Sequence, residues 1–287
     1  MKPKETLKRG IKGALQRAGI SVQRAAAPDE RALYTDYEPS TLERRPFLNV
    51  GAGAFAHPYW TNLDFGSEWY RDHQKREAIV EYDLTALAPL PFEDASIELI
   101  YTSHTIEHVP DEAVLNLFRE ARRVLKPGGG LRVTCPDAAL LYRSVQHQRR
   151  SWWAWREEWY SGPHSTSGGL GPVTLLDFLI REVATPRSRH YVHASEPHAP
   201  EEVEGWFKSL GREELLDRLI EGLKFDPQRP GDHINWWHAN KVLACLRSAG
   251  FEHADRSSAG QSLFPPLTET RFDSTRPNMS LFVEAIR

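Results

Sequence analysis

The segment at residues 47–53, with the sequence FLNVGAG, is an apolar run that ends in a glycine turn. Glycines directly after a buried strand let the backbone turn sharply and approach a ligand, with the N-terminus of a following helix facing it. Further strand candidates lie at 60–63, 78–82, 97–101 and 130–135, and a helical pattern beginning near Asp111 separates the last two. Strands that alternate with helices predict an α/β fold with a parallel sheet.

The 287 residues allow one large domain, or one domain that carries a sizeable insertion. We expect a basic N-terminal helix and connector at 1–45, a core at 46–140 and 237–287, and a helical insertion at 141–236. The insertion is crowded with tryptophan and contains helical patterns near 203–210 and 215–223. After it the core resumes with a helix to Ala249 and with strands near 251–258 and 279–285.

Short motifs follow the ends of the predicted strands. Residues 62–64 read NLD, 82–84 read YDL, 103–108 read SHTIEH, and 125–130 read LKPGGG. In this order the set resembles the class I S-adenosylmethionine-dependent methyltransferases, and the compressed form at 47–64 is similar to a bacterial subgroup that acts on small molecules and saccharides. The resemblance implies a Rossmann-like fold with a mostly parallel seven-stranded sheet, and S-adenosyl-L-methionine as the cofactor.

A dinucleotide site is the alternative interpretation of residues 51–56, which read GAGAFA. That fingerprint places its acid about 20 residues after the turn, beyond a full helix and a second strand. Asp64 comes only 13 residues after Gly51, and His57 and Pro58 interrupt the interval. The spacing therefore argues against a dinucleotide.

The resemblance assigns roles to polar residues at the strand ends. It implies that Asp64 accepts hydrogen bonds from both ribose hydroxyls, and that Asp83 accepts one from the adenine amino group. Ordinary turn or capping residues are the alternative at both positions. Asn49 stands where many relatives carry an acid, and it cannot supply a charge for the methionine ammonium. The residues predicted to bind the cofactor are Asn49, Gly51, Ala52, Gly53, Asp64, Phe65, Asp83, Leu84, Thr102 and Ser103.

Methyl transfer to an alcohol requires a positioned base, because the hydroxyl loses its proton during the attack. His233 precedes the helix with which the core resumes, in a place where relatives bring a histidine over the edge of the sheet. The alternative is a loop histidine that caps this helix. His104 follows the fourth strand, where the reactive methyl is expected. We therefore predict His233 and His104 as the catalytic candidates.

The tryptophans guide the prediction of the acceptor. Nine in one chain is a high number, and flat indole rings often pack on the C–H faces of sugars. Trp153, Trp237 and His164 are the predicted acceptor contacts, while a core role is the alternative for the tryptophans. We expect no metal, since the spacing of His164, His190, His193 and His198 matches no tetrahedral pattern and their Pro-rich loop is a poor rigid cage.

The net charge of −3 gives no reason to expect nucleic acid, and two separated cysteines favour a reducing compartment. No apolar run approaches the roughly 18 residues of a membrane span, so we expect a cytoplasmic protein. Residues 1–24 carry seven basic side chains against one acid. This segment packs on the domain or on a second subunit of a homodimer, or it contacts an anionic membrane surface.

Together these observations predict an enzyme that O-methylates a saccharide or a saccharide-containing small molecule. A lipid-linked or secondary-metabolite acceptor is one alternative, supported by the basic N-terminal segment. A non-catalytic binding or scaffold protein is the other, because Asn49 lacks a charge and no base is obvious.

Overall fold

A computed structural model describes residues 31–66, 79–166 and 170–287 of the chain. Residues 31–36, with the short turn η1 (Ala32–Tyr34), belong to a separate unit from residues 37–287. The expected basic helix at 1–24 lies outside the described residues. Among the residues that are described, no helix is long and apolar enough to span a bilayer.

Within the described residues of the second unit, seven strands form one sheet in the order β3-β2-β1-β4-β5-β7-β6. Neighbouring strands from β3 to β5 run parallel, whereas β7 is antiparallel to both β5 and β6. This arrangement confirms the Rossmann-like class I methyltransferase fold. The strands are β1 (Phe47–Val50), β2 (Trp60–Asp64), β3 (Ile79–Glu81), β4 (Ile97–Ser103), β5 (Leu125–Pro136), β6 (His253–Arg256) and β7 (Ser280–Ile286).

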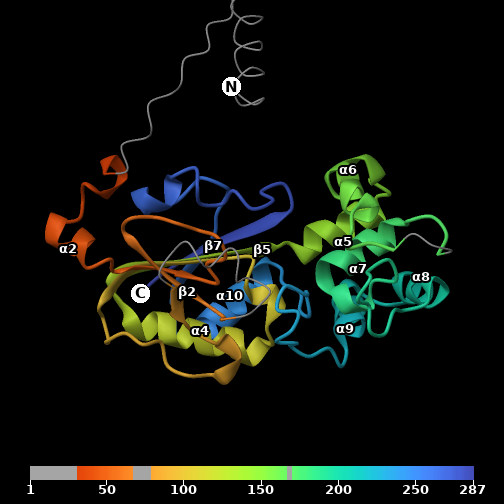
Figure 1. The fold of residues 1–287 in the computed structure, drawn as a ribbon, viewed down its shortest axis with the longest axis horizontal. Helices are drawn as coiled ribbons and strands as arrows, with labels where there is room; N and C mark the ends of the chain where they lie inside the picture. Colours follow the sequence, from red (N-terminus) through yellow and green to blue (C-terminus); the bar gives the residue numbers. More distant parts are fainter. Residues whose placement is uncertain (1–30, 67–78, 167–169) are drawn as a thin grey trace, which may run out of the picture. The chain divides into compact units, whose positions relative to one another are not determined.

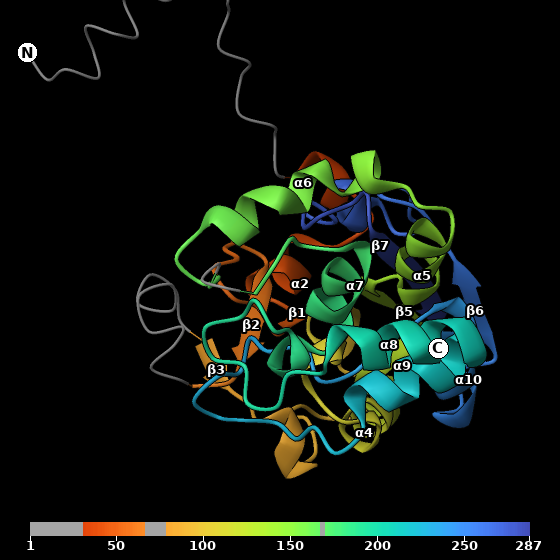
Figure 2. The ribbon, with the colours of Figure 1, turned by 90° about the vertical axis from the view of Figure 1, so that its right-hand side faces the viewer.

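The helices fall into two groups (Figures 1 and 2). Two of them, α4 (Asp111–Val124) and α10 (Ala239–Ser248), pack together against one face of the sheet. The second group belongs to the insertion and gathers beyond the end of β5. Its members are α5 (Ala138–Gln146), α6 (Ala154–Glu157), α7 (Leu175–Val183), α8 (Pro200–Ser209) and α9 (Arg212–Ile220).

Shorter elements complete the unit. The short helix α2 (Pro39–Glu43) precedes β1, and 3-10 turns occur in the connections between the larger elements. They are η2 (Leu84–Ala86), η3 (Ile106–His108), η4 (Arg150–Trp153), η5 (Glu158–Ser161), η6 (Thr185–Arg187) and η7 (Pro265–Thr268).

Helix α4 ends earlier than its sequence pattern indicates. The next strand was predicted only from residue 130, but Leu125 already has extended torsions and begins β5. Ile97 pairs with Leu125, and Leu99 pairs with Gly130, so the intervening residues form an irregularity in β5. The glycines therefore shape a strand and not a helix end, and the helix-to-strand connection has no loop.

Side chains alternate between the two faces of the sheet, as strand geometry requires. The face toward α4 and α10 is aliphatic and forms a continuous buried core, which includes Leu48, Val50, Ile100, Leu131 and Val133. The opposite face carries aromatic and charged side chains. The C-terminal segment 257–279 covers it, with Phe272 packed 4.9 Å from Tyr101 and 4.8 Å from Trp60 between ring centroids.

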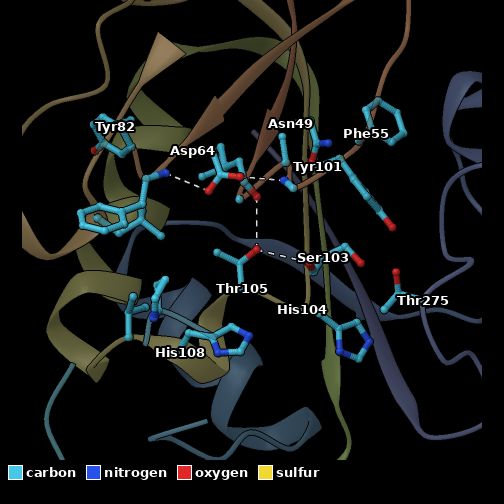
Figure 3. Close-up of a pocket in the computed structure, with 18 of the residues that line it drawn as sticks. Asn49, Phe55, Asp64, Tyr82, Tyr101, Ser103, His104, Thr105, His108 and Thr275 are labelled. Carbon is cyan, nitrogen blue, oxygen red and sulfur yellow. Dashed lines mark hydrogen bonds between the residues drawn. The ribbon is translucent and has the colours of Figure 1, made fainter. Parts of the chain in front are cut away.

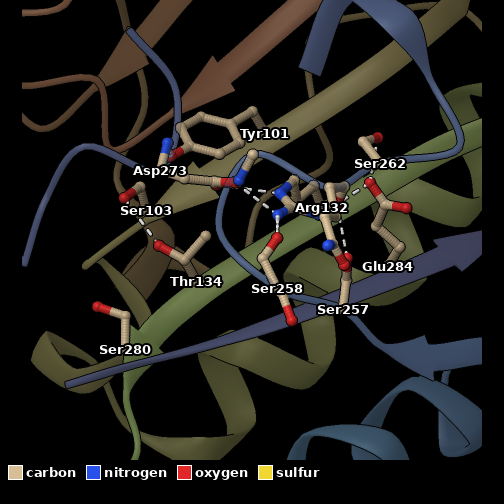
Figure 4. A network of polar contacts seen from close by, with 12 residues as sticks. Tyr101, Ser103, Arg132, Thr134, Ser257, Ser258, Ser262, Asp273, Ser280 and Glu284 are labelled. Carbon is tan, nitrogen blue, oxygen red and sulfur yellow. Dashed lines mark hydrogen bonds and ion pairs between the residues drawn. The ribbon is translucent and has the colours of Figure 1, made fainter. Parts of the chain in front are cut away.

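A buried ion network holds this C-terminal segment to the sheet (Figure 4). The fully buried Arg132 on β5 donates from Nε to Asp273 at 3.0 Å and from Nη1 to Glu284 on β7 at 2.9 Å. It also donates to the carbonyl oxygens of Ser258 and Gln261. The guanidinium is thus satisfied by partners from three stretches of chain, and Asp273 fixes the segment that reaches the edge of the sheet.

The insertion has a hydrophobic core of its own. Residues of α5, α7 and α9 pack together with the indoles of Trp153 and Trp236, and this core is separate from the one under α4 and α10. Trp153 stacks on Phe178 with ring centroids 5.1 Å apart. Trp153 and Trp236 therefore stabilise the fold of the insertion.

We predict that Asp273→Asn lowers the free energy of unfolding by about 3–5 kcal/mol, because it leaves the buried Arg132 without its main counter-charge. The control is Glu221→Gln, which removes an exposed partner of Arg218 and should change this energy by less than about 1 kcal/mol. Urea unfolding followed by circular dichroism measures both. Equal losses in the two variants would contradict the structural role of the network.

Candidate functional site

A cavity of about 420 Å³ opens at the carboxyl ends of the parallel strands, between β1 and β4 (Figure 3). The order of the sheet reverses at this point, since β2 and β3 lie on one side of β1 while β4 and β5 lie on the other. Open α/β sheets bind ligands at such a switch point. The volume falls within the range of small-molecule pockets.

The glycine turn after β1 forms one wall. Gly51 has a φ of +71°, and a Cβ on it would lie 2.1 Å from Oγ1 of Thr105 and 2.5 Å from its Cγ2. Thr105 in turn donates to the carbonyl oxygens of Val50 and Ser103. The end of β4 therefore packs directly against the turn, and only glycine fits at residue 51.

Asp64 lies at the end of β2 beside this turn. Its carboxylate accepts from the amide of Gly53 at 2.7 Å and from that of Phe65 at 2.8 Å. These bonds fix the rotamer and aim the carboxylate at the cavity that it lines. Each carboxylate oxygen can accept more than one hydrogen bond.

Asp83 caps a turn with one carboxylate oxygen and lines the cavity. Its Oδ1 caps η2 by accepting from the amide of Thr85 at 2.8 Å and from its hydroxyl at 2.7 Å. Within the described part of the chain, no protein group bonds to Oδ2 of Asp83. One oxygen thus holds the turn while the other is available on the cavity wall, next to Leu84.

Most of the predicted cofactor residues therefore meet in one place. The cavity wall contains Asn49, Gly51, Ala52, Gly53, Asp64, Phe65, Asp83, Leu84 and Ser103. Thr102 is the exception, since it is 1% exposed and its side chain lies on the sheet face opposite that of Ser103. Because strand side chains alternate, Thr102 points away from the cavity, and the predicted contact with the cofactor does not form in this arrangement.

His104 projects from the end of β4 into the cavity, with a left-handed φ of 52°. Strained torsions in a residue other than glycine often mark functional positions. Its Nδ1 lies 3.1 Å from Oε1 of Glu107, and its Nε2 lies 2.8 Å from Oγ of Ser280. A histidine with a carboxylate beside one ring nitrogen and a hydroxyl beside the other has the surroundings of a general base.

The phenols on the wall are poor alternatives to this histidine. Burial raises the pKa of Tyr82 to about 12 and also raises that of Tyr101. Tyr82 donates to the carbonyl of Ala88, and Tyr101 accepts from the amide of Asp273. Both phenols stay protonated near neutral pH, so neither can accept a proton.

His233 is buried and absent from the cavity wall. Its Nδ1 lies 2.6 Å from the carbonyl oxygen of Glu182, and burial together with nearby His108 holds its pKa well below the ordinary value. Direct contact with an acceptor is therefore excluded in this arrangement. His233 does face His108, which lines the cavity, with ring centroids 4.8 Å apart.

The tryptophans predicted to contact the acceptor are core residues. Trp153 is fully buried, and Trp237 is 1% exposed and donates from Nε1 to the carbonyl of Ile106 at 3.0 Å. The segment around Trp153 is not one continuous α-helix, because η4, α6 and η5 succeed one another and change the turn geometry. This corrects both predictions. His164 is exposed on the insertion outside the cavity wall, and its acceptor contact stays a prediction.

Two distant segments that the sequence did not reveal complete the wall. Phe225 and Pro230 come from the end of the insertion, and Phe225 packs edge-on against Phe65 at 5.5 Å between centroids. The segment held by Asp273 adds Arg271, Ser274 and Thr275. Neither segment has a local sequence signature, since each reaches the site through long-range packing.

Comparisons with known proteins agree with this geometry. Residues 50–133 match the model of a family described as "Methyltransferase domain". An uncharacterized 37.1 kDa protein in a transposon of Streptomyces fradiae is 45% identical over 58 residues, which are 20% of this chain and 16% of that protein. Phosphoethanolamine N-methyltransferase 2 of Caenorhabditis elegans is 33% identical over 64 residues, which are 22% of this chain and 14% of that protein.

Among solved structures, an S-adenosylmethionine-dependent methyltransferase from Mesorhizobium loti aligns with 84% of this chain and 90% of its own. The TM-score is 0.37 and the sequence identity is 19%. The curated relatives share only a small part of their length with this chain, as their coverage of 16% and 14% shows.

We predict that Gly51→Ala lowers the free energy of unfolding more than Gly128→Ala does. Both glycines have positive φ, so alanine strains each backbone by about 1–2 kcal/mol. Only at residue 51 does the new methyl also meet Thr105, which adds about 1–3 kcal/mol of overpacking, while residue 128 faces open space. Thermal and urea unfolding compare the two. Indistinguishable variants would show that Thr105 does not confine the turn.

Proposed function

We propose that this protein, which carries a methyltransferase domain that uses S-adenosyl-L-methionine as its cofactor, transfers the methyl group to a hydroxyl of a saccharide or saccharide-containing small molecule. The observation that carries the proposal is the meeting of Asp64, the Gly51 turn and His104 in one cavity. The acid at the end of β2 would bind the nucleoside, and the histidine at the end of β4 would accept a proton in the same crevice.

The residues on the wall fit the cofactor. The glycine turn leaves room beside Gly53, where no atom would lie within 4 Å of an added Cβ. Asp64 would hold the ribose hydroxyls and Oδ2 of Asp83 the adenine amino group, with Leu84 against the ring. Asn49, buried at the floor, would offer its amide to the methionine end. When bound, the cofactor supplies a sulfonium methyl that needs little activation.

His104 would receive the proton of the acceptor hydroxyl. Glu107 beside Nδ1 favours the tautomer that carries hydrogen there, so that Nε2 presents its lone pair. In this arrangement that lone pair accepts from the hydroxyl of Ser280, whose Oγ is 2.8 Å away. The hydroxyl can instead turn its proton to the carbonyl oxygen of Arg276 at 2.9 Å, which would open Nε2 to the acceptor hydroxyl. His104 would then act as the base, with Glu107 near Nδ1 as its orienting carboxylate. The cavity walls would fix the approach of the hydroxyl.

Support for a saccharide comes from the acceptor side of the cavity. Ser103, Ser274, Thr275 and Arg271 supply hydroxyl and guanidinium groups, and Phe225 supplies a flat apolar face. Polar groups beside an aromatic ring suit the hydroxyls and C–H faces of a sugar. We further propose that residues 141–236 contribute to acceptor binding through Phe225, and that 46–140 and 237–287 hold the cofactor and add the polar groups on the acceptor side. We also propose that the enzyme acts in the cytoplasm on such small molecules without nucleic acid.

Methyl transfer from isotopically labelled S-adenosylmethionine to a panel of acceptors tests the proposal. The panel contains free and nucleotide-linked saccharides, lipid-linked acceptors and aromatic metabolites, and mass spectrometry locates the label. We expect the label on a saccharide hydroxyl. Transfer only to the other classes would reject the saccharide, and absence of S-adenosylhomocysteine binding would reject the activity in favour of a scaffold.

We predict that Asp64→Ala weakens S-adenosylhomocysteine binding by roughly 100-fold. Two charge-assisted hydrogen bonds to the ribose contribute about 3 kcal/mol together. Asp255→Ala, which removes an exposed carboxylate from β6, is the control and should bind as the unmodified protein does. Isothermal titration calorimetry gives both constants, and equal affinity in the two variants would remove Asp64 from the site.

We predict that His104→Gln lowers the rate of methyl transfer by about 10²–10⁴-fold while the Kd for S-adenosylhomocysteine stays within about twofold. Glutamine retains polarity but cannot take up a proton. The control is His147→Gln, an exposed histidine that follows α5. If the variant transfers methyl at the normal rate in single-turnover measurements, His104 is not the base.

A further inference from the structure

Three potential ligands converge behind His104, where the cavity meets the insertion. Glu107 and His108 come from η3, and His233 comes from the segment before α10. One ligand atom from each lies within 4.8 Å of the others. Oε1 of Glu107 is 4.0 Å from Nε2 of His108, and the rings of His108 and His233 stand at 85° to each other.

Backbone contacts bring these three residues together. The carbonyl oxygen of Glu107 accepts from the amides of Ile234 at 2.9 Å and Asn235 at 3.1 Å. His233 itself is held by Thr185, whose amide donates to the carbonyl of His233 at 2.9 Å. The histidine from the distant segment is therefore locked next to η3.

The proton positions of both histidines are set by backbone carbonyls. Nδ1 of His108 lies 3.0 Å from the carbonyl oxygen of Asp232, and Nδ1 of His233 lies 2.6 Å from that of Glu182. A carbonyl oxygen can only accept, so each Nδ1 carries the hydrogen and each Nε2 keeps a lone pair. Histidines that bind metals are usually oriented through the opposite nitrogen in this way.

Glu107 is a buried carboxylate that the described part of the protein leaves unsatisfied. The residue is 1% exposed, and neither of its oxygens accepts a hydrogen bond of good geometry there. His104 approaches Oε1 at 3.1 Å, and among the residues that the structure describes none donates a hydrogen bond to Oε2. A buried acceptor without a donor is costly, and a cation is a natural partner for it.

We propose that Glu107, His108 and His233 bind a divalent cation of the zinc class. Two imidazole nitrogens and one carboxylate form the protein ligand set of catalytic zinc sites, which leave a fourth position open. Tetrahedral bonds of about 2.0–2.2 Å would bring the ligand atoms to about 3.3–3.6 Å from one another, a closure of about 1 Å by side-chain rotation. The spacing of His164, His190, His193 and His198 along the sequence gave no sign of this site.

The position of the cation would give it a function. His104 and His108 both line the cavity, so the open coordination position would face the acceptor. A hydroxyl bound there becomes more acidic, and its proton passes to Nε2 of His104. This consequence rests on the proposed methyl transfer, whereas the binding of the cation does not.

Titration of the chelator-treated, untagged full chain with Co²⁺, followed by visible absorption, and with Zn²⁺, followed by calorimetry, tests the site. We expect one tight equivalent with a tetrahedral Co²⁺ spectrum that Zn²⁺ displaces. His108→Gln and Glu107→Gln should each weaken Zn²⁺ binding at least about tenfold. His253→Gln, an exposed histidine on β6, is the matched control and should bind Zn²⁺ normally.

Circular dichroism and S-adenosylhomocysteine binding are measured on each variant. His108 is partly exposed, with 16% of its side chain accessible, so His108→Gln tests the site even if Glu107→Gln fails to fold. Normal Zn²⁺ affinity in folded His108→Gln, or no stoichiometric Co²⁺ binding by the unmodified protein, would overturn the site. Cation binding without S-adenosylhomocysteine binding would instead reject the proposed methyl transfer and leave the site standing.

Discussion

The reversal of strand order between β1 and β4 is the constraint on which the rest of the structure depends. The chain leaves β1 toward one side of the sheet and leaves β4 toward the other, so their carboxyl ends cannot be covered by the same connection. A crevice results from topology alone. Gly51, Asp64, Asp83 and His104 all lie at strand ends beside it, which is why a few short motifs can build most of one wall.

The remaining walls are brought to the crevice by polar anchors that bury charge or backbone groups. Arg132 fixes Asp273 and with it the segment that carries Ser274 and Thr275. The carbonyl of Glu107 fixes the segment after His233, which follows Phe225 and Pro230 in the chain. Both anchors join stretches more than 100 residues apart. The cavity wall formed by the strand ends is thus local in sequence, while the opposite wall is assembled from long-range contacts.

This difference explains what the sequence could predict. Hydrophobic periodicity and turn residues were enough to predict the strands and the cavity wall at their ends, because a strand end followed by glycine or aspartate is a local pattern. Thr102 was misplaced although it adjoins Ser103, since the alternation of the strand sends the two side chains to opposite faces. Thr105 was missed because its contact with Gly51 depends on the pairing of β1 with β4, which no single segment encodes.

The tryptophans show a different limit. The segment around Trp153 changes between 3-10 and α geometry and turns this side chain inward, which no single helical period predicts. For His233 the predicted place before α10 is correct, yet its ring turns toward Glu182 and His108 and away from the cavity. Proximity in sequence to a site does not fix the direction of a side chain.

The separate hydrophobic core of the insertion has an evolutionary consequence. Substitutions among α7, α8 and α9 can accumulate without disturbing the aliphatic layer under the sheet, since the two layers do not share their main packing residues. The helical module can therefore change in sequence while the sheet and the strand ends that line the cavity keep their packing.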